Sequence, residues 1–206
     1  MTDQRTLHVK TPLGPDVLLA AHMSGHEQLG APFDYRVSVL SPDPTIDLSA
    51  LLGQPASVQV ELPAGSVRHF HGYVTDFHYT GWSGDHATYE LTLRPWLWLL
   101  SLTSNCRIFQ NLSVPEIVKQ ICREHGFSDF RESLSGSYQP REYCVQYRES
   151  DFNYLSRLLE DEGIYYFVEH EEGKHTVVFA DSPSAHAPAS GYESVPFYPP
   201  DRKSVV

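Results

Sequence analysis

The segment from Arg141 to Asp181 constrains the fold of this chain most, because it combines a helix signal with several strand signals. Ser150 and Asp151 suit a helix start, since a short polar side chain accepts hydrogen bonds from the free amides of the first turn. Four apolar residues then follow at spacings of three and four: Phe152, Leu155, Leu158 and Leu159. Gly163 ends the helix, because glycine enters the left-handed conformation without penalty.

Strands flank this helix on both sides. Tyr143–Arg148 precedes it, and Ile164–Glu169 follows it with apolar residues on both faces, which predicts a strand covered on both sides. The turn at Glu171–Lys174 carries a glycine and leads into a further strand at His175–Ala180. The segment therefore predicts strand, helix, strand and strand.

The first 94 residues have a different pattern, in which apolar and polar residues alternate between turn signals. The clearest examples are Phe33–Val39, Ser57–Leu62 and His86–Leu93. A period of two indicates antiparallel sheet with one face on a core. The phase changes within Val67–Tyr79, which predicts a β-bulge near Thr75 and Asp76. Five or more such strands predict a small antiparallel β-barrel or sandwich, and we expect closure to remove the exposed edges.

Three shorter segments complete the secondary structure. We expect a hairpin loop at Tyr79–His86 and a short helix at Asp47–Leu52. Pro95–Leu100 predicts a short apolar helix that ends the β domain. Its Trp96 and Trp98 favour packing at a seam between domains, and a ligand-stacking platform is the alternative.

A second main helix is predicted after Ser113. Ser113 and Glu116 have the spacing of a capping box. The stripe that we expect to be buried is Val114, Ile117, Val118, Ile121 and Cys122. Gly126 ends this helix, and Ser128–Gln139 reads as a loop around a weak strand.

The fold class that these patterns predict is a β-rich α+β protein, with an N-terminal antiparallel β-barrel and then a mixed α+β domain with two main helices. We expect the barrel at residues 1–100, the α+β domain at 101–181, and a Pro-rich connector or tail at 182–206.

Composition excludes several partner classes. The formal net charge of the 206 residues is −11, which argues against free binding to nucleic acid or to an anionic membrane surface. Apolar runs are too short to insert into a membrane, and the N-terminus lacks the apolar core of a signal peptide. Cys106, Cys122 and Cys144 have no CxxC spacing, so we expect buried thiols in a reducing compartment.

Catalytic motifs are missing from the sequence, so we expect no enzyme, no cofactor and no metal site. One alternative is a metal hydrolase built on His69 and His71, with a third ligand from Asp76 or His78. Another is a glycan-binding module, in which Tyr79 and Trp82 stack a sugar.

The acidic cluster Glu160, Asp161 and Glu162 departs from the usual helix pattern. Anions at the carboxyl end of a helix oppose its dipole, at a cost of roughly 0.3–1 kcal/mol each when exposed. We expect this cluster to contact a neighbouring subunit or a partner. A solvated cluster or an internal salt bridge is the simpler interpretation.

Two long blocks carry a family resemblance. RESDFNYLSRLLEDEGIYYFVEH (148–170) resembles the signature of the VgrG family, the spike proteins of type VI secretion systems, which are related to phage tail hub proteins. The similarity extends through LRPWLWLLSLTSNCRIFQNLSVPEIVKQIC (93–122), and the first ninety residues match in pattern only.

The resemblance implies a structural role. It implies a homotrimer whose two barrels per subunit form a pseudo-sixfold ring on the hexameric Hcp tube, beside baseplate components. Effectors would attach through C-terminal parts that this sequence lacks, and the second barrel would fall largely beyond Val206, as in a truncated or shortened relative. It also implies assembly in the bacterial cytoplasm and export by the type VI machine without a signal peptide.

Overall fold

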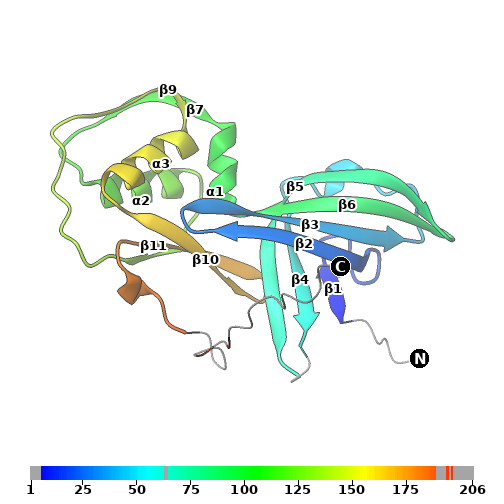
Figure 1. Cartoon of the computed structure of the whole chain (residues 1–206). Helices are drawn as coiled ribbons and strands as arrows, with labels where there is room; N and C mark the ends of the chain where they lie inside the picture. The colour runs from blue at the N-terminus through cyan, green and yellow to red at the C-terminus, as the bar shows by residue number, and fades with distance from the viewer. Residues whose placement is uncertain (1–5, 63–64, 189–193, 195, 197–206) are drawn as a thin grey trace, which may run out of the picture.

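The computed structural model describes residues 6–62, 65–188, 194 and 196. They form two lobes: a curled β-sheet, and a mixed lobe in which helices pack on strands (Figure 1). The Pro-rich connector or tail predicted from residue 182 onward lies mostly outside the described residues. Among the described residues, no helix combines the length and the apolar character needed to cross a membrane.

The first lobe is one antiparallel sheet with the strand order β1-β4-β5-β6-β3-β2. Its strands are β1 (Leu7–Lys10), β2 (Leu19–Gln28), β3 (Ala31–Ser41), β4 (Pro55–Glu61), β5 (Val67–Ser83) and β6 (His86–Arg94). The sheet curls so that its edge strands β1 and β2 approach each other (Figure 1). The predicted antiparallel barrel is confirmed as a half-barrel. The expected removal of both edges is wrong, because β1 and β2 remain the ends of the sheet.

Alternation places every second residue of β3 in the core. Phe33, Tyr35, Val37 and Val39 are buried, as the period of two predicts. The short helix expected near Asp47 is the 3₁₀ turn η1 (Leu48–Ala50), in which the Asp47 side chain accepts a hydrogen bond from the Ser49 amide.

The long strand β5 bends at two places. Its register against β6 shifts between Val74 and Asp76, which confirms the predicted bulge, and shifts again between Tyr79 and Gly81. The hairpin loop expected at Tyr79–His86 is shorter than predicted. The ladder continues to the pair Ser83 and His86, because the bulge at Gly81 restores the pairing.

The second lobe combines three helices with two small sheets. The helices are α1 (Trp96–Leu99), α2 (Val114–Glu124) and α3 (Asp151–Asp161). The strands are β7 (Ser104–Phe109), β8 (Phe130–Ser133), β9 (Cys144–Ser150), β10 (Tyr165–Glu171) and β11 (Lys174–Ala180). β11 lies between antiparallel β10 and parallel β8, while β7 and β9 form a separate ribbon. The short turns η2 (Leu100–Leu102) and η3 (Pro183–Ala185) connect these elements.

Both main helices follow their sequence signals. The Ser113 amide donates to the Glu116 carboxylate at 2.8 Å, so the capping box is confirmed. All five residues of the predicted stripe on α2 are buried. In α3 the Ser150 side chain caps the first turn, and Gly163 stops the helix with a φ of +69°. Tyr154 joins the buried stripe of α3, whereas Phe152 is only partly buried.

The two lobes meet at α1. Trp96 is buried, stacks on Phe127 with ring centroids 4.8 Å apart, and donates its indole N–H to the Asp129 carbonyl at 3.3 Å. Trp96 thus packs in the core of the second lobe, and Phe127 in turn meets the Tyr73 ring of β5 across the seam, with centroids 6.2 Å apart. The ring of the half-buried Trp98 is covered by the Arg94 guanidinium, 4.8 Å from its centroid.

Two expectations about burial need correction. Phe167 of β10 is only partly buried: it lines an open groove and lies beside the His186 ring, with ring centroids 4.6 Å apart. Cys106 is exposed rather than buried, because it lies on the uncovered face of the β7–β9 ribbon. Cys122 and Cys144 are buried free thiols, as predicted.

Candidate functional site at the seam between the lobes

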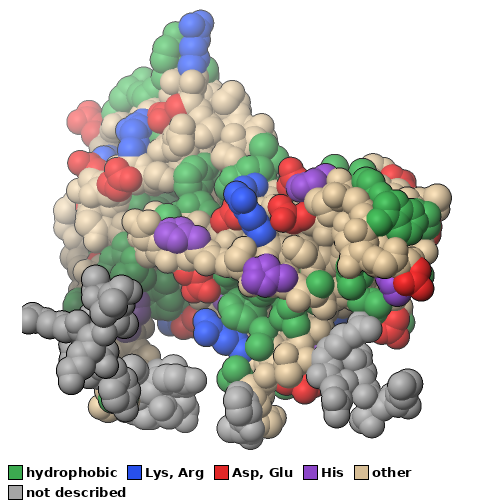
Figure 2. All heavy atoms as spheres, turned by 45° about the vertical axis from the view of Figure 1, so that its right-hand side comes forward, with side chains coloured by type: hydrophobic (Ala, Val, Ile, Leu, Met, Phe, Trp, Pro, Cys, Tyr) green, Lys and Arg blue, Asp and Glu red, His purple; other side chains and the backbone are tan. Residues whose placement is uncertain are grey.

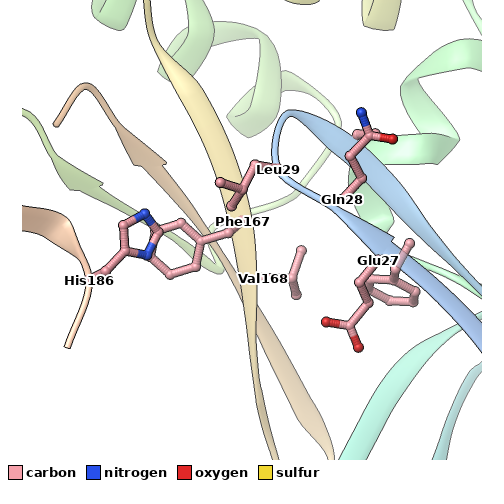
Figure 3. A pocket seen from close by; sticks show the side chains of 8 residues that line it. Glu27, Gln28, Leu29, Phe167, Val168 and His186 are labelled. Atoms are coloured by element: carbon pink, nitrogen blue, oxygen red, sulfur yellow. The ribbon is translucent and has the colours of Figure 1, made fainter. Parts of the chain in front are cut away.

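A groove of about 300 Å³ lies where the β2–β3 turn approaches β10. Figure 3 shows Leu29, Phe167 and Val168 at this groove, with Glu27 on one side and His186 on the other. Its walls are mainly apolar, so it offers hydrophobic contact bordered by one carboxylate and one imidazole.

A single main-chain hydrogen bond fixes the rim of the groove. The Gly30 amide donates to the Tyr166 carbonyl at 2.8 Å, which ties the β2–β3 turn to the outer edge of β10. β10 is an edge strand of its sheet, so this bond occupies a carbonyl that would otherwise face solvent.

Three histidines lie close together behind the groove. The Nδ1 atoms of His71 and His175 are 2.7 Å apart, and the His71 amide donates to His170 Nδ1 at 3.1 Å. His71 is 6% exposed and His175 is 2% exposed. They come from β5, β11 and β10, so the cluster spans both lobes.

Burial keeps these rings neutral. It lowers the pKa of His71, lowers that of His170 to about 4, and lowers that of His175 to about 3. A low-dielectric environment disfavours the charged imidazolium, which is the physical cause of all three shifts.

The metal ligands that the hydrolase alternative requires are not brought together. His71 turns inward to His175, whereas His69 lies beside Gln59 at 3.4 Å. Asp76 and His78 pair with each other at 2.7 Å. In the part of the chain that the structure describes, no group of three or more His, Cys, Asp or Glu side chains is arranged to hold a metal ion.

The aromatic pair of the glycan alternative lies near the tip of the β5–β6 hairpin. Trp82 is 59% exposed and Tyr79 is 45% exposed, and the Tyr79 ring makes a T-shaped contact with the buried Tyr89 ring. Figure 2 shows hydrophobic side chains gathered at the far end of the first lobe, where this hairpin ends.

The acidic cluster lies at the end of α3 and has a basic neighbour. Arg141 Nη2 lies 2.5 Å from both Asp161 Oδ2 and Glu162 Oε1. Glu160 is exposed. Two of the three anions therefore share one internal cation, which reduces the cost of placing them at a helix carboxyl end. Figure 2 shows acidic side chains spread over both lobes rather than gathered in one field.

A buried carboxylate lies at the other end of α3. Asp151 has no exposed surface and accepts from Gln146 Nε2 and Arg107 Nη2, both at 2.7 Å, while His125 Nε2 lies 2.6 Å away. Burial by itself raises the pKa of Asp151, but hydrogen bonds from Gln146, His125 and Asn105 and the charge of Arg107 outweigh it, so the pKa is lowered.

Sequence reasoning missed His170, His175 and the buried role of Asp151. One signal was available for His175, because it shares the strand phase of Val177 and Phe179, both buried. A polar residue in phase with core residues indicates a buried hydrogen-bonded group.

The comparisons with known proteins identify the class. Residues 26–205 match the family model of the phage tail baseplate hub (GPD). The fold also matches the c3393 protein of E. coli with a TM-score of 0.78 and 32% identity, covering 89% of this chain and 51% of that one. That protein is described as a component of the type VI secretion system with structural similarity to the T4 bacteriophage tail proteins gp27 and gp5.

Curated relatives narrow the assignment. The chain is 52% identical over 196 residues to the type VI secretion system spike protein VgrG1c of Pseudomonas aeruginosa, covering 95% of this chain and 27% of that protein. It is 38% identical over 150 residues to the actin cross-linking toxin VgrG1 of Vibrio cholerae, covering 73% of this chain and 14% of that protein. The chain belongs to the phage tail baseplate hub family and, within it, to the VgrG proteins. It spans about a quarter of the length of VgrG1c.

Proposed function

We propose that this chain is a structural hub module of a type VI secretion spike, which acts by fitting other subunits and transforms no substrate. The observation that carries the proposal is 52% identity to a spike protein over 95% of the chain. Identity at that level preserves the fold, so the surfaces that fit partners in the relative have counterparts at the same places of the fold here.

The seam supports a rigid module. Tyr73 of the first lobe packs against the core of the second, and Val168 of β10 packs against both cores. Surfaces on the two lobes are thereby held in a fixed relation, which is what a ring of repeated subunits requires.

We extend the proposal to the assembly. In the full-length protein the hub is a homotrimer, whose pseudo-sixfold ring seats on the hexameric tube protein Hcp and contacts baseplate components. Residues 1–100 and 101–181 act as its barrel and α+β domains. Assembly takes place in the bacterial cytoplasm, and the type VI machine then exports the spike without a signal peptide.

Effector activity is assigned to other segments of the full-length protein. The match covers only 14% of the toxin relative, so most of that protein lies outside the shared part and can carry its cross-linking activity. The relatives described above are spike and tail proteins and one VgrG toxin, and they lend no support to a glycan-binding module.

The acidic cluster is proposed as one contact surface. Glu160 is exposed, and the Asp161 side chain is 64% exposed despite its pairing with Arg141. Charge complementarity at an interface speeds association and fixes the relative orientation of the partners more than it adds affinity. We therefore expect the partner surface that contacts Glu160, Asp161 and Glu162 to carry basic side chains.

Co-purification with the hexameric tube protein tests the proposed function. Tagged chain is mixed with untagged tube protein at low and at high salt, and the bound tube protein is quantified. Retention that weakens with salt is expected, because exposed charge pairs are screened. If this chain and an unrelated protein of similar charge retain equal amounts of the tube protein, the proposal is wrong.

A further inference from the structure

We propose that His71, His170 and His175 form an acid-sensitive latch, which holds the two lobes together while all three rings are neutral and releases the seam when they gain protons. This inference does not depend on the assembly role, because it concerns only contacts within the chain.

Two main-chain amides fix the direction of the hydrogen bonds. The Trp96 amide donates to His175 Nε2 at 3.1 Å, so that nitrogen accepts and the proton of the neutral ring is on Nδ1. His175 Nδ1 then donates across 2.7 Å to His71 Nδ1. The proton of the neutral His71 ring is therefore on Nε2.

The His71 amide fixes the direction of the remaining hydrogen bonds in this network. It donates to His170 Nδ1 at 3.1 Å, which places the His170 proton on Nε2. That nitrogen lies 3.0 Å from Tyr35 Oη and donates to it. The Tyr35 hydroxyl in turn donates to Glu27 Oε1 at 2.6 Å, at the border of the groove.

Each ring therefore accepts a hydrogen bond at the nitrogen where a second proton would have to bind. A proton on His175 Nε2 would face the Trp96 amide, and one on His170 Nδ1 would face the His71 amide. A proton on His71 Nδ1 would face the Nδ1–H of His175. Each protonation therefore breaks one hydrogen bond of this network and leaves a buried imidazolium, which is costly without a paired anion.

The charged and titratable neighbours do not remove this penalty. Those that act on the rings from the packed elements are Glu27 of β2, Arg68 of β5 and Asp129 in the loop before β8. Tyr35 of β3 and Tyr73 of β5 are neutral near pH 7, since both have raised pKa values. Glu27 and Asp129 favour protonation and Arg68 opposes it, yet burial still leaves the pKa of all three histidines lowered.

The three rings lie between the lobes. His71 belongs to the first sheet, while His170 and His175 belong to the hairpin β10–β11 of the second lobe. Trp96 begins α1, the helix that joins the lobes. Losing bonds here loosens the hairpin from β5, and because the His170 ring packs against Phe33 and Tyr35, it also uncovers part of the half-barrel core.

The expected pH dependence has a definite sign. The closed seam holds neutral histidines, and the open seam exposes them with a pKa of about 6.5. Above that value the latch is fully effective. As the pH falls from about 6.5 toward 4, the closed-to-open ratio falls about tenfold per pH unit for each histidine that is neutral when closed and charged when open.

Nitrogen NMR of ¹⁵N-histidine-labelled protein tests the ring assignments at pH 7.5. His175 is expected to be the Nδ1–H tautomer, and His71 and His170 the Nε2–H tautomer. A charged ring, or the Nε2–H tautomer at His175, would overturn the proposal.

Amide hydrogen exchange tests the opening. The protection factors of the Trp96 and His71 amides are expected to fall at least about tenfold from pH 6 to pH 5. The Ile117 amide, which donates to Ser113 within α2, is the internal reference and is expected to stay constant. Protection at Trp96 and His71 that is independent of pH across this range would contradict the latch.

A non-titrating variant separates protonation from packing. In both His71→Asn and His170→Asn, the Asn side-chain oxygen takes the place of the accepting Nδ1. Position 71 therefore still accepts from His175 Nδ1, and position 170 still accepts from the main-chain amide of residue 71. The double variant is expected to lose most of the pH dependence at the amide of position 71, whose acceptor no longer titrates, while the Trp96 amide keeps the part that His175 carries. If it folds and keeps the wild-type pH dependence, the proposal is wrong; if it does not fold, the NMR and exchange results on the natural chain decide.

Discussion

Arg107 Nη2 lies 2.7 Å from Asp151 Oδ1, and the Asp151 side chain has no exposed surface. This pair joins β7 to the first turn of α3, while Gln146 of β9 donates to the same carboxylate oxygen. The ribbon β7–β9 is too small to be stable alone, so this buried anion ties it to the helix.

Removing that anion is predicted to destabilise the second lobe strongly. Asp151→Ala removes the carboxylate that Arg107 Nη2 and Gln146 Nε2 share, and breaking a buried pair costs about 3–5 kcal/mol. Urea unfolding followed by circular dichroism measures the loss. Asp161→Asn is the matched control at the other end of α3, and its exposed pair with Arg141 predicts a loss below about 1 kcal/mol. Equal effects of the two variants would contradict this account.

Much of the architecture was predictable from local signals. The alternation in β3, the capping box at Ser113 and the stop at Gly163 each correspond to one local physical cause, and the structure confirms them. The bulge near Asp76 was predictable because the apolar phase changes there.

The polar contacts at the seam were not predictable in the same way. His71 and His175 are 104 positions apart, and only tertiary structure brings their rings together. The partner of Asp161 was also hidden, because Arg141 lies in a loop whose path the sequence does not determine. Long-range pairing of charged and polar side chains leaves no periodic signal.

The free energy of unfolding is predicted to decrease in two stages as the pH falls. The buried histidines have lowered pKa values, so their contribution is present above about pH 6.5 and is lost toward pH 4. Asp151 also has a lowered pKa, so its contribution is present above about pH 4 and is lost only below that. Urea titrations from pH 7.5 to pH 3.5 measure both stages. A flat profile between pH 6.5 and pH 4.5 would contradict the histidine stage.

A close backbone approach at Gly72 predicts a second sensitive position. A Cβ atom there would lie 3.0 Å from both the Arg94 carbonyl oxygen and Leu93 Cβ, so Gly72→Ala forces β5 away from β6. The expected loss is about 1–3 kcal/mol, as for other overpacked sites. Gly53→Ala is the comparison, since its Cβ meets nothing within 4 Å and only its φ of +74° is unfavourable, which costs about 1 kcal/mol. Thermal melts that rank Gly53→Ala as the more damaging change would refute the contact argument.

The acidic cluster gives a prediction about assembly rather than stability. Glu160→Gln removes an exposed charge from the proposed contact surface and is expected to lower retention of the tube protein several-fold at low salt. Glu171→Gln removes an exposed charge from the β10–β11 turn and is expected to leave retention unchanged. If Glu160→Gln only stabilises α3 by a few tenths of a kcal/mol and retention is unaffected, the cluster is a solvated feature of the helix end.

Electron microscopy of the hexameric tube protein mixed with this chain shows whether the chain seats on the tube. We expect additional density at the ends of the tubes, placed as a ring. The result that would contradict this expectation is tubes with bare ends while the chain stays free in solution at the same concentrations.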